Sequence, residues 1–221
     1  MAENIPFALV PTGLPAMRSK TRRTTIVVLA LCVLALEMVR PPSPVAAQGK
    51  LVVESVAETK VKQLPPGPLF WRIDTFATLA AAKAAAGQTG LAAEVAGKAW
   101  LFTLGPRGGS ATGGTKVAEI GPVPTPAAPE YLLRINHAYG PPGAATRVHS
   151  HPGAEAFYVL AGRMSQRTPH GVVTLDVGQS APGHGADVPM QVSSSGTTDL
   201  DQLVMFVVDA TKPFSSPAQF K

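Results

Sequence analysis

Short apolar segments separated by Pro- and Gly-containing turns make up most of this chain. From residue 51 onward they recur at intervals of roughly eight to twelve residues, which is the spacing typical of strands in β-sandwiches and barrels. Their short length and turn-rich boundaries favour strands over helices. The predicted strands span residues 51–56, 70–76, 98–104, 116–120, 131–139, 146–150, 155–162, 171–177, 188–192 and 202–210. The pattern therefore predicts an all-β fold.

One segment departs from this pattern. Residues 77–97 read ATLAAAKAAAGQTGLAAEVAG and are rich in alanine, the residue with the highest helix propensity. Gly87 and Gly90 interrupt the segment. We therefore expect one Ala-rich helix, which packs together with extra N-terminal strands on the main β-domain.

The first 47 residues have the layout of a secretory signal peptide. Residues 17–23 are basic, residues 26–36 form an uninterrupted apolar run, and Val45-Ala46-Ala47 offers small side chains before a cleavage point. The apolar run is short for a membrane span, so this leader predicts export to the periplasm or the medium. The alternative is an uncleaved N-terminal membrane anchor, which would bury Glu37. Both Met1 and Met17 are candidate starts.

The leader also carries more than half of the charge surplus. The net charge is +5, and residues 1–47 hold five basic and two acidic side chains, which leaves fourteen basic and twelve acidic ones elsewhere. Because the remainder has no basic run or stripe, nucleic-acid binding is not predicted. The single cysteine, Cys32, lies in the apolar run. A mature chain would have no cysteine, so His, Asp and Glu would have to hold any metal.

Ionisable side chains concentrate in residues 143–162, GAATRVHSHPGAEAFYVLAG. His149 and His151 are two apart on a predicted strand, so both imidazoles face one side, ~6.5–7 Å apart along the backbone. After a Pro-Gly turn, Glu155 begins the next strand and shares a face with Phe157. A buried carboxylate beside two imidazoles is costly unless a cation binds all three groups. Two histidines and a carboxylate are also the ligand set of many non-haem iron sites.

These residues resemble the first sequence motif of the cupin superfamily at every spacing. Gly143 is followed by five residues, His149-x-His151, three residues, Glu155, six residues and Gly162. The resemblance covers roughly residues 131–210 and implies a cupin-type double-stranded β-helix, a jelly-roll-like barrel of two sheets. It also implies a divalent metal ion (Fe, Mn or Zn) near one mouth of the barrel, with the two histidines and the glutamate as its ligands.

The second cupin motif is degenerate in this chain. The family pattern is Gly, five residues, Pro-x-Gly, two residues and a fourth ligand histidine, whereas residues 178–192 read GQSAPGHGADVPMQV. Counting places either Val188 or Pro189 at that position, and neither side chain binds a metal. His184 stands a few residues earlier, in the turn, and is a candidate displaced fourth ligand. Without it, the fourth place would be open to water.

The chain thus divides into the leader (1–47), the N-terminal strands and helix (48–130), the cupin barrel (131–210) and a C-terminal tail (211–221). Two functions of different classes fit this interpretation. One is a metal-dependent, oxygenase-like enzyme acting on a small organic substrate, and the other is a non-catalytic barrel that binds a small molecule. The sequence does not choose between them, because cupin folds host both. A second copy of the chain, in a homodimer, is a further candidate partner, and a membrane is one only if the leader is uncleaved.

If the leader is a cleaved signal peptide, the exported protein should begin near Gln48, directly after Val45-Ala46-Ala47. Mass spectrometry of the protein recovered from the envelope or the medium measures this N-terminus. Recovery of the full-length chain in the membrane fraction would instead show that residues 26–36 anchor it.

Overall fold

The structure, a computed structural model, describes residues 49–221. The predicted leader, its cleavage point and Cys32 lie outside these residues. Within residues 49–221, no helix is long and apolar enough to cross a membrane.

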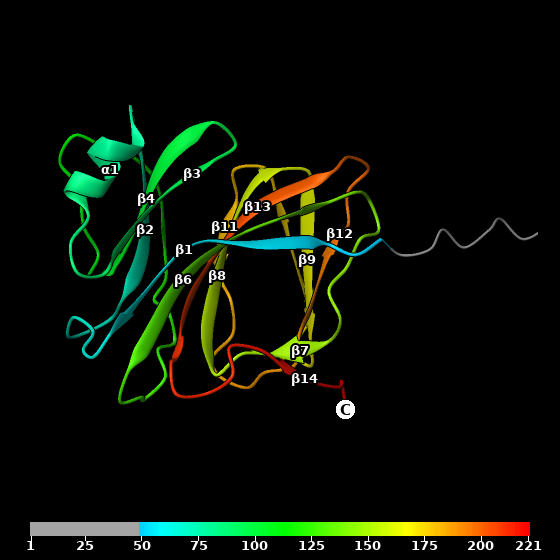
Figure 1. Cartoon of the computed structure of the whole chain (residues 1–221). Coiled ribbons are helices and arrows are strands. Elements are labelled where there is room, and N and C mark those ends of the chain that lie inside the picture. Colours follow the sequence, from blue (N-terminus) through cyan, green and yellow to red (C-terminus); the bar gives the residue numbers. More distant parts are fainter. Residues whose placement is uncertain (1–48) are drawn as a thin grey trace, which may run out of the picture. The chain divides into compact units, whose positions relative to one another are not determined.

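Two antiparallel sheets face each other and form a barrel (Figure 1). The larger sheet has five strands in the order β1-β6-β13-β8-β11, and the smaller has three in the order β10-β9-β12. A two-stranded ribbon of β7 and β14 lies at one end. The bounds are β1 (Val52–Val61), β6 (Tyr131–Gly140), β7 (His149–Ser150), β8 (Gly153–Ala161), β9 (Arg163–Thr168), β10 (Gly171–Asp176), β11 (Ser180–Pro182), β12 (Gln191–Ser194), β13 (Leu200–Asp209) and β14 (Ser216–Pro217).

Two isolated bridges extend the smaller sheet toward β7. They pair Ala145 with Ser193 and His149 with Met190, so the segment that enters β7 runs beside β12. This strand order confirms the all-β, cupin-type double-stranded β-helix expected from the motif at residues 143–162. Strand β1, which lies in the segment 48–130, pairs with β6 along its whole length and is an edge strand of the barrel.

A separate four-stranded sheet, in the order β3-β4-β2-β5, covers the outer face of the five-stranded sheet. One apolar cluster contains side chains from both sheets, including Trp71 and Phe102 on one side and Leu133 and Leu203 on the other. Helix α1 packs against the outer sheet through Ala82. These elements are β2 (Phe70–Phe76), α1 (Leu79–Ala85), β3 (Gly90–Val95), β4 (Lys98–Gly105) and β5 (Thr115–Ile120).

The three central strands of the five-stranded sheet, β6, β13 and β8, are therefore buried on both faces. Along β8, Ala154 and Ala156 pack toward the four-stranded sheet, whereas Phe157 and Val159 belong to the cluster inside the barrel. The alternation follows from the two-residue period of a strand. It places Glu155 on the interior face, on the same side as Phe157.

The helix predicted at residues 77–97 is wrong in its second half. Helix α1 ends at Ala85, and residues Gly90–Val95 form strand β3, paired with β4. Leu91, Ala93 and Val95 are buried while the residues between them are less so, which is the period of a strand. Alanine propensity is a weak preference, and pairing with a neighbouring strand overrides it here.

Packing between the two sheets should contribute strongly to stability, and Ile73 tests this. Its side chain lies fully buried between them, so Ile73→Ala should lower the free energy of unfolding by about 2–5 kcal/mol. Urea unfolding followed by circular dichroism measures the loss. Val172→Ala on β10 is the matched control, since Val172 is exposed and its truncation should change the free energy by less than about 0.5 kcal/mol. Equal losses in the two variants would contradict this account of the sheet packing.

Candidate functional site

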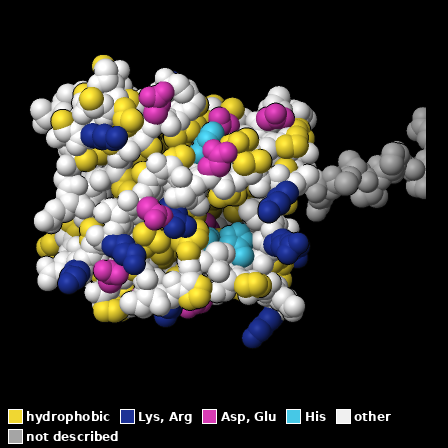
Figure 2. All heavy atoms as spheres, viewed as in Figure 1, with side chains coloured by type: hydrophobic (Ala, Val, Ile, Leu, Met, Phe, Trp, Pro, Cys, Tyr) yellow, Lys and Arg dark blue, Asp and Glu magenta, His cyan; other side chains and the backbone are white. Residues whose placement is uncertain are grey.

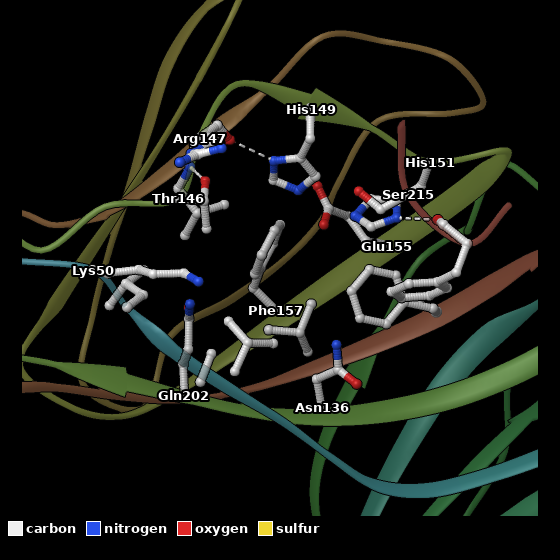
Figure 3. Close-up of a pocket in the computed structure, with 17 residues that line it drawn as sticks. Lys50, Asn136, Thr146, Arg147, His149, His151, Glu155, Phe157, Gln202 and Ser215 are labelled. Carbon is white, nitrogen blue, oxygen red and sulfur yellow. Dashed lines mark hydrogen bonds between the residues drawn. The ribbon is translucent and has the colours of Figure 1, made fainter. Parts of the chain in front are cut away.

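A cavity of about 460 Å³ opens inside the barrel and contains the three residues singled out by the sequence motif. Its lining includes His149, His151 and Glu155, and Figure 3 shows these side chains converging on one end. In the space-filling view, histidine is visible at the surface with basic side chains close by (Figure 2). His149 is partly exposed, so the cavity reaches the solvent at this residue.

Both histidines are oriented by hydrogen bonds to backbone carbonyls. Nδ1 of His149 lies 2.8 Å from the carbonyl oxygen of Arg147, and Nδ1 of His151 lies 2.7 Å from that of Phe214. Because a carbonyl oxygen only accepts, each Nδ1 must carry a proton, so in the neutral imidazole Nε2 keeps a free lone pair. The two ring centroids are 4.9 Å apart. Such backbone contacts are typical of histidines that bind metals through Nε2.

His151 is held by β13 and by the residues that follow it in the chain. Strand β14 pairs with β7, and the rings of Phe206 and Phe214 lie 4.9 and 4.8 Å from the imidazole centroid. This packing leaves His151 only 4% exposed. Burial lowers the pKa of His151 to about 4, against the opposing effect of the hydrogen bond to Phe214. The imidazole is therefore neutral at pH 7, which is the form that binds a metal.

Glu155 is the buried acid of the cavity. It is 2% exposed, and its Oε1 accepts a hydrogen bond from Nε2 of Gln166 on β9. Burial raises the pKa of Glu155 to about 8, although the hydrogen bond from Gln166 opposes the shift. Gly183 packs directly on this residue, with its backbone N–H donating to the carbonyl oxygen of Glu155 at 2.7 Å. A Cβ at position 183 would come within 2.7 Å of Glu155 Cγ, so a glycine is needed there.

His149, His151 and Glu155 are chemically suited to a divalent metal ion, but their side chains are not arranged in coordination geometry. Across residues 49–221, no three His, Cys, Asp or Glu side chains are arranged to hold a metal ion as they stand. Two imidazole Nε2 atoms with free lone pairs and one carboxylate are nevertheless ligands that Fe, Mn and Zn accept. Since Gln166 holds Oε1 of Glu155, Oε2 is the oxygen available to turn toward an ion.

The candidate fourth ligand, His184, lies elsewhere. Its ring lies beside that of His170, with the two ring centroids 5.6 Å apart. His184 is not part of the cavity lining. Burial and the neighbouring His170 lower the pKa of His184. His149 pairs with Met190 in an antiparallel β-bridge. Met190 comes one or two positions after Pro189 and Val188, where counting along the second motif placed the fourth ligand. Its sulfur lies 3.5 Å from Nε2 of Gln166, the same atom that donates to Glu155.

Several residues of the cavity were missed by the sequence reasoning. Lys50, Asn136, Gln202, Phe214 and Ser215 all line it. They come from four segments of the chain, and none belongs to a motif with a characteristic spacing. The alternation along β6 and β13 could have placed Asn136 and Gln202 inside the barrel, because the two-residue period puts them on the same faces as Ala138 and Val204.

Comparison with known proteins gives likeness to solved structures only. No family model matches the chain, and neither does any curated protein. Among solved structures, a cupin-like protein from Thermotoga maritima is 17% identical over 40% of this chain and 65% of that one, with a TM-score of 0.36. A structure described as that of the DMSP lyases RdDddP and RnDddQII is also similar, with 25% identity over 39% of this chain and 44% of that one and a TM-score of 0.34. The polyketide cyclase RemF from Streptomyces resistomycificus is 16% identical over 40% of this chain and 62% of that one, with a TM-score of 0.34. The chain thus matches less than two thirds of each of these proteins.

The barrel has the fold of the cupin superfamily. Its own strand order and the motif at residues 143–162, whose side chains meet in the cavity, define it as such. What the chain does with this cavity is a separate question.

The raised pKa of Glu155 makes the metal-free protein sensitive to pH. The carboxyl ionises near its ordinary pKa of 4.5 when unfolded but near 8 when folded, so unfolding releases a proton between these values. Stability should therefore fall as pH rises from 5 to 8, by at most about 1.4 kcal/mol per pH unit from this group. Glu155→Gln should remove that slope, so its advantage over the wild type should grow with pH.

Urea unfolding of the metal-free proteins at a series of pH values measures this. Glu94→Gln on β3, an exposed position, is the control and should leave the slope unchanged. Parallel curves for wild type and Glu155→Gln would contradict the raised pKa.

Proposed function

We propose that this chain is an exported cupin that holds a divalent metal ion through His149, His151 and Glu155 and acts on a small organic molecule as a metal-dependent enzyme. The observation that carries the proposal is the pair of histidines with Nδ1 bound to backbone carbonyls, which leaves each Nε2 on the side of the cavity where the buried carboxyl group of Glu155 lies (Figure 3). Export is supported by the leader at residues 1–47.

A bound cation would remove the main electrostatic cost of this site. A carboxylate buried among apolar side chains is unfavourable in its charged form, which is why the pKa of Glu155 is raised in the structure. An adjacent cation favours the ionised form. His151 needs no deprotonation at pH 7 because its pKa is already lowered to about 4. The two histidines and Glu155 thus suit a divalent ion better than they suit an empty polar cluster.

The remaining walls of the cavity would orient a substrate against the ion. Phe157, Val204 and Phe206 form apolar sides that exclude water, and the polar residues Lys50, Asn136 and Gln202 lie on the surrounding wall. When bound, an ion of this kind supplies Lewis-acid or oxygen chemistry. The protein's part is to bind and align the substrate with the open face of the ion.

A non-catalytic binding protein is the second candidate. In its favour, the lining residues within 49–221 include no tyrosine, no cysteine and no second carboxylate that could move protons during a reaction. An oxygen-uptake and turnover screen on the metal-loaded protein separates the two functions. Metal-dependent turnover supports the enzyme, and tight stoichiometric ligand uptake without turnover supports the binding protein.

Substitution of single histidines tests the metal site. His149→Ala and His151→Ala should each abolish stoichiometric metal uptake, because either change leaves only two of the three proposed ligands. His170→Ala and His184→Ala are the controls and should retain the metal, since both residues lie outside the cavity lining. Elemental analysis of the purified, reconstituted proteins gives the metal content. Equal content in wild type and His149→Ala would overturn the site, and loss in His184→Ala would make that residue a ligand.

A further inference from the structure

We propose that the cavity selects a small organic carboxylate, and that Lys50 and Gln202 receive its anionic group on the wall away from the candidate metal ligands. This inference rests on the proposed function and names the ligand class of the same cavity. Figure 3 shows Lys50 and Gln202 on one side of the cavity and Glu155 and His151 on the other.

The first support is charge. The cavity lining holds two basic side chains, Lys50 and Arg147, and one acid, Glu155, which lies at the metal end. In the part of the chain that the structure describes, neither basic side chain takes part in an ion pair. The Lys50 end is therefore positive with or without a cation at the histidines. Such a surface attracts an anion.

The second support is the amide of Gln202, which is 1% exposed and lines the cavity. Its nitrogen points into the cavity from the same side as the ammonium of Lys50 (Figure 3). The carbonyl oxygens of Gln202 and Asn136 lack hydrogen-bond partners within residues 49–221, and because a carboxylate only accepts, a ligand that also carries a hydroxyl would be needed to satisfy them. The amide N–H groups of Gln202 and the ammonium of Lys50 are both hydrogen-bond donors, and together they suit a negatively charged oxygen of a ligand.

The way the cavity is built from strands, and its apolar lining, favour a carboxylate ligand over a phosphate. Phosphate is typically bound by several backbone N–H groups at a helix N-terminus. The only helix among residues 49–221, α1, belongs to the four-stranded sheet, and the cavity is built from strands and connecting segments. Its donors near Lys50 are side chains, and Phe157 and Val204 lie beside them. A monoanion attached to an apolar body matches this combination.

Two probes of the same shape and different charge test the proposal. We expect 3-phenylpropionate to bind the zinc-loaded protein at least tenfold more tightly than 3-phenylpropionamide in isothermal calorimetry, a difference of about 1.4 kcal/mol. Lys50→Met and Gln202→Leu should each reduce this preference to less than about threefold, because the affinity for the acid should fall more than the affinity for the amide. Lys83→Met, on the exposed side of α1, is the charge-matched control and should retain the preference.

Three outcomes would overturn the proposal. One is equal affinity of the wild type for the acid and its amide, and a second is an unchanged preference in Lys50→Met, which would place the carboxylate on the metal instead. The third is the absence of saturable binding at millimolar concentration by acetate, benzoate, phenylacetate and 3-phenylpropionate alike. Repeating the titrations on metal-free protein, with metal content measured separately, distinguishes failure of the ligand assignment from failure of the metal site.

Discussion

The burial of the central strands of the five-stranded sheet on both faces is the constraint on which the rest of this structure depends. Strands β8 and β13 must place an apolar side chain on each face, toward the outer sheet at one residue and toward the barrel interior at the next. A polar residue on the interior face is therefore sealed inside and must be paired by a neighbour or a ligand. Glu155 and Gln202 occupy such positions on adjacent strands. The cavity is thus a consequence of polar residues placed on a sheet that has no solvent-exposed face in this region.

Much of this arrangement follows from the sequence, because the relevant signals are local. Strand spacing predicted an all-β fold, and the two-residue period correctly put Glu155 and Phe157 on one face. The spacing between Gly143 and Gly162 predicted the cupin barrel. At Gly162 the backbone φ is +72°, and a Cβ would lie 2.3 Å from the carbonyl oxygen of Asp199, so a side chain there would be strained.

The features that the sequence did not reveal depend on contacts between distant segments. Residues 90–95 look helical by composition, and only their pairing with β4 makes them a strand. Lys50 and Gln202 are more than 150 residues apart in the sequence, and no spacing rule connects them. Counting along a degenerate motif led to Val188 or Pro189, whereas the residue opposite His149 is Met190. Register between strands is set by packing and turns, which counting along one segment does not capture.

The hydrogen bond between His151 and Phe214 joins two parts of the chain that are 63 residues apart. Phe214 and Ser215 also form part of the cavity wall. The same short segment therefore closes one side of the cavity and fixes which nitrogen of His151 carries the proton. If this segment moves away, the cavity widens and the imidazole becomes free to rotate and to exchange tautomers. The width of the cavity and the orientation of His151 therefore depend on the same segment, so that a wider entrance is obtained only with a less well-oriented imidazole.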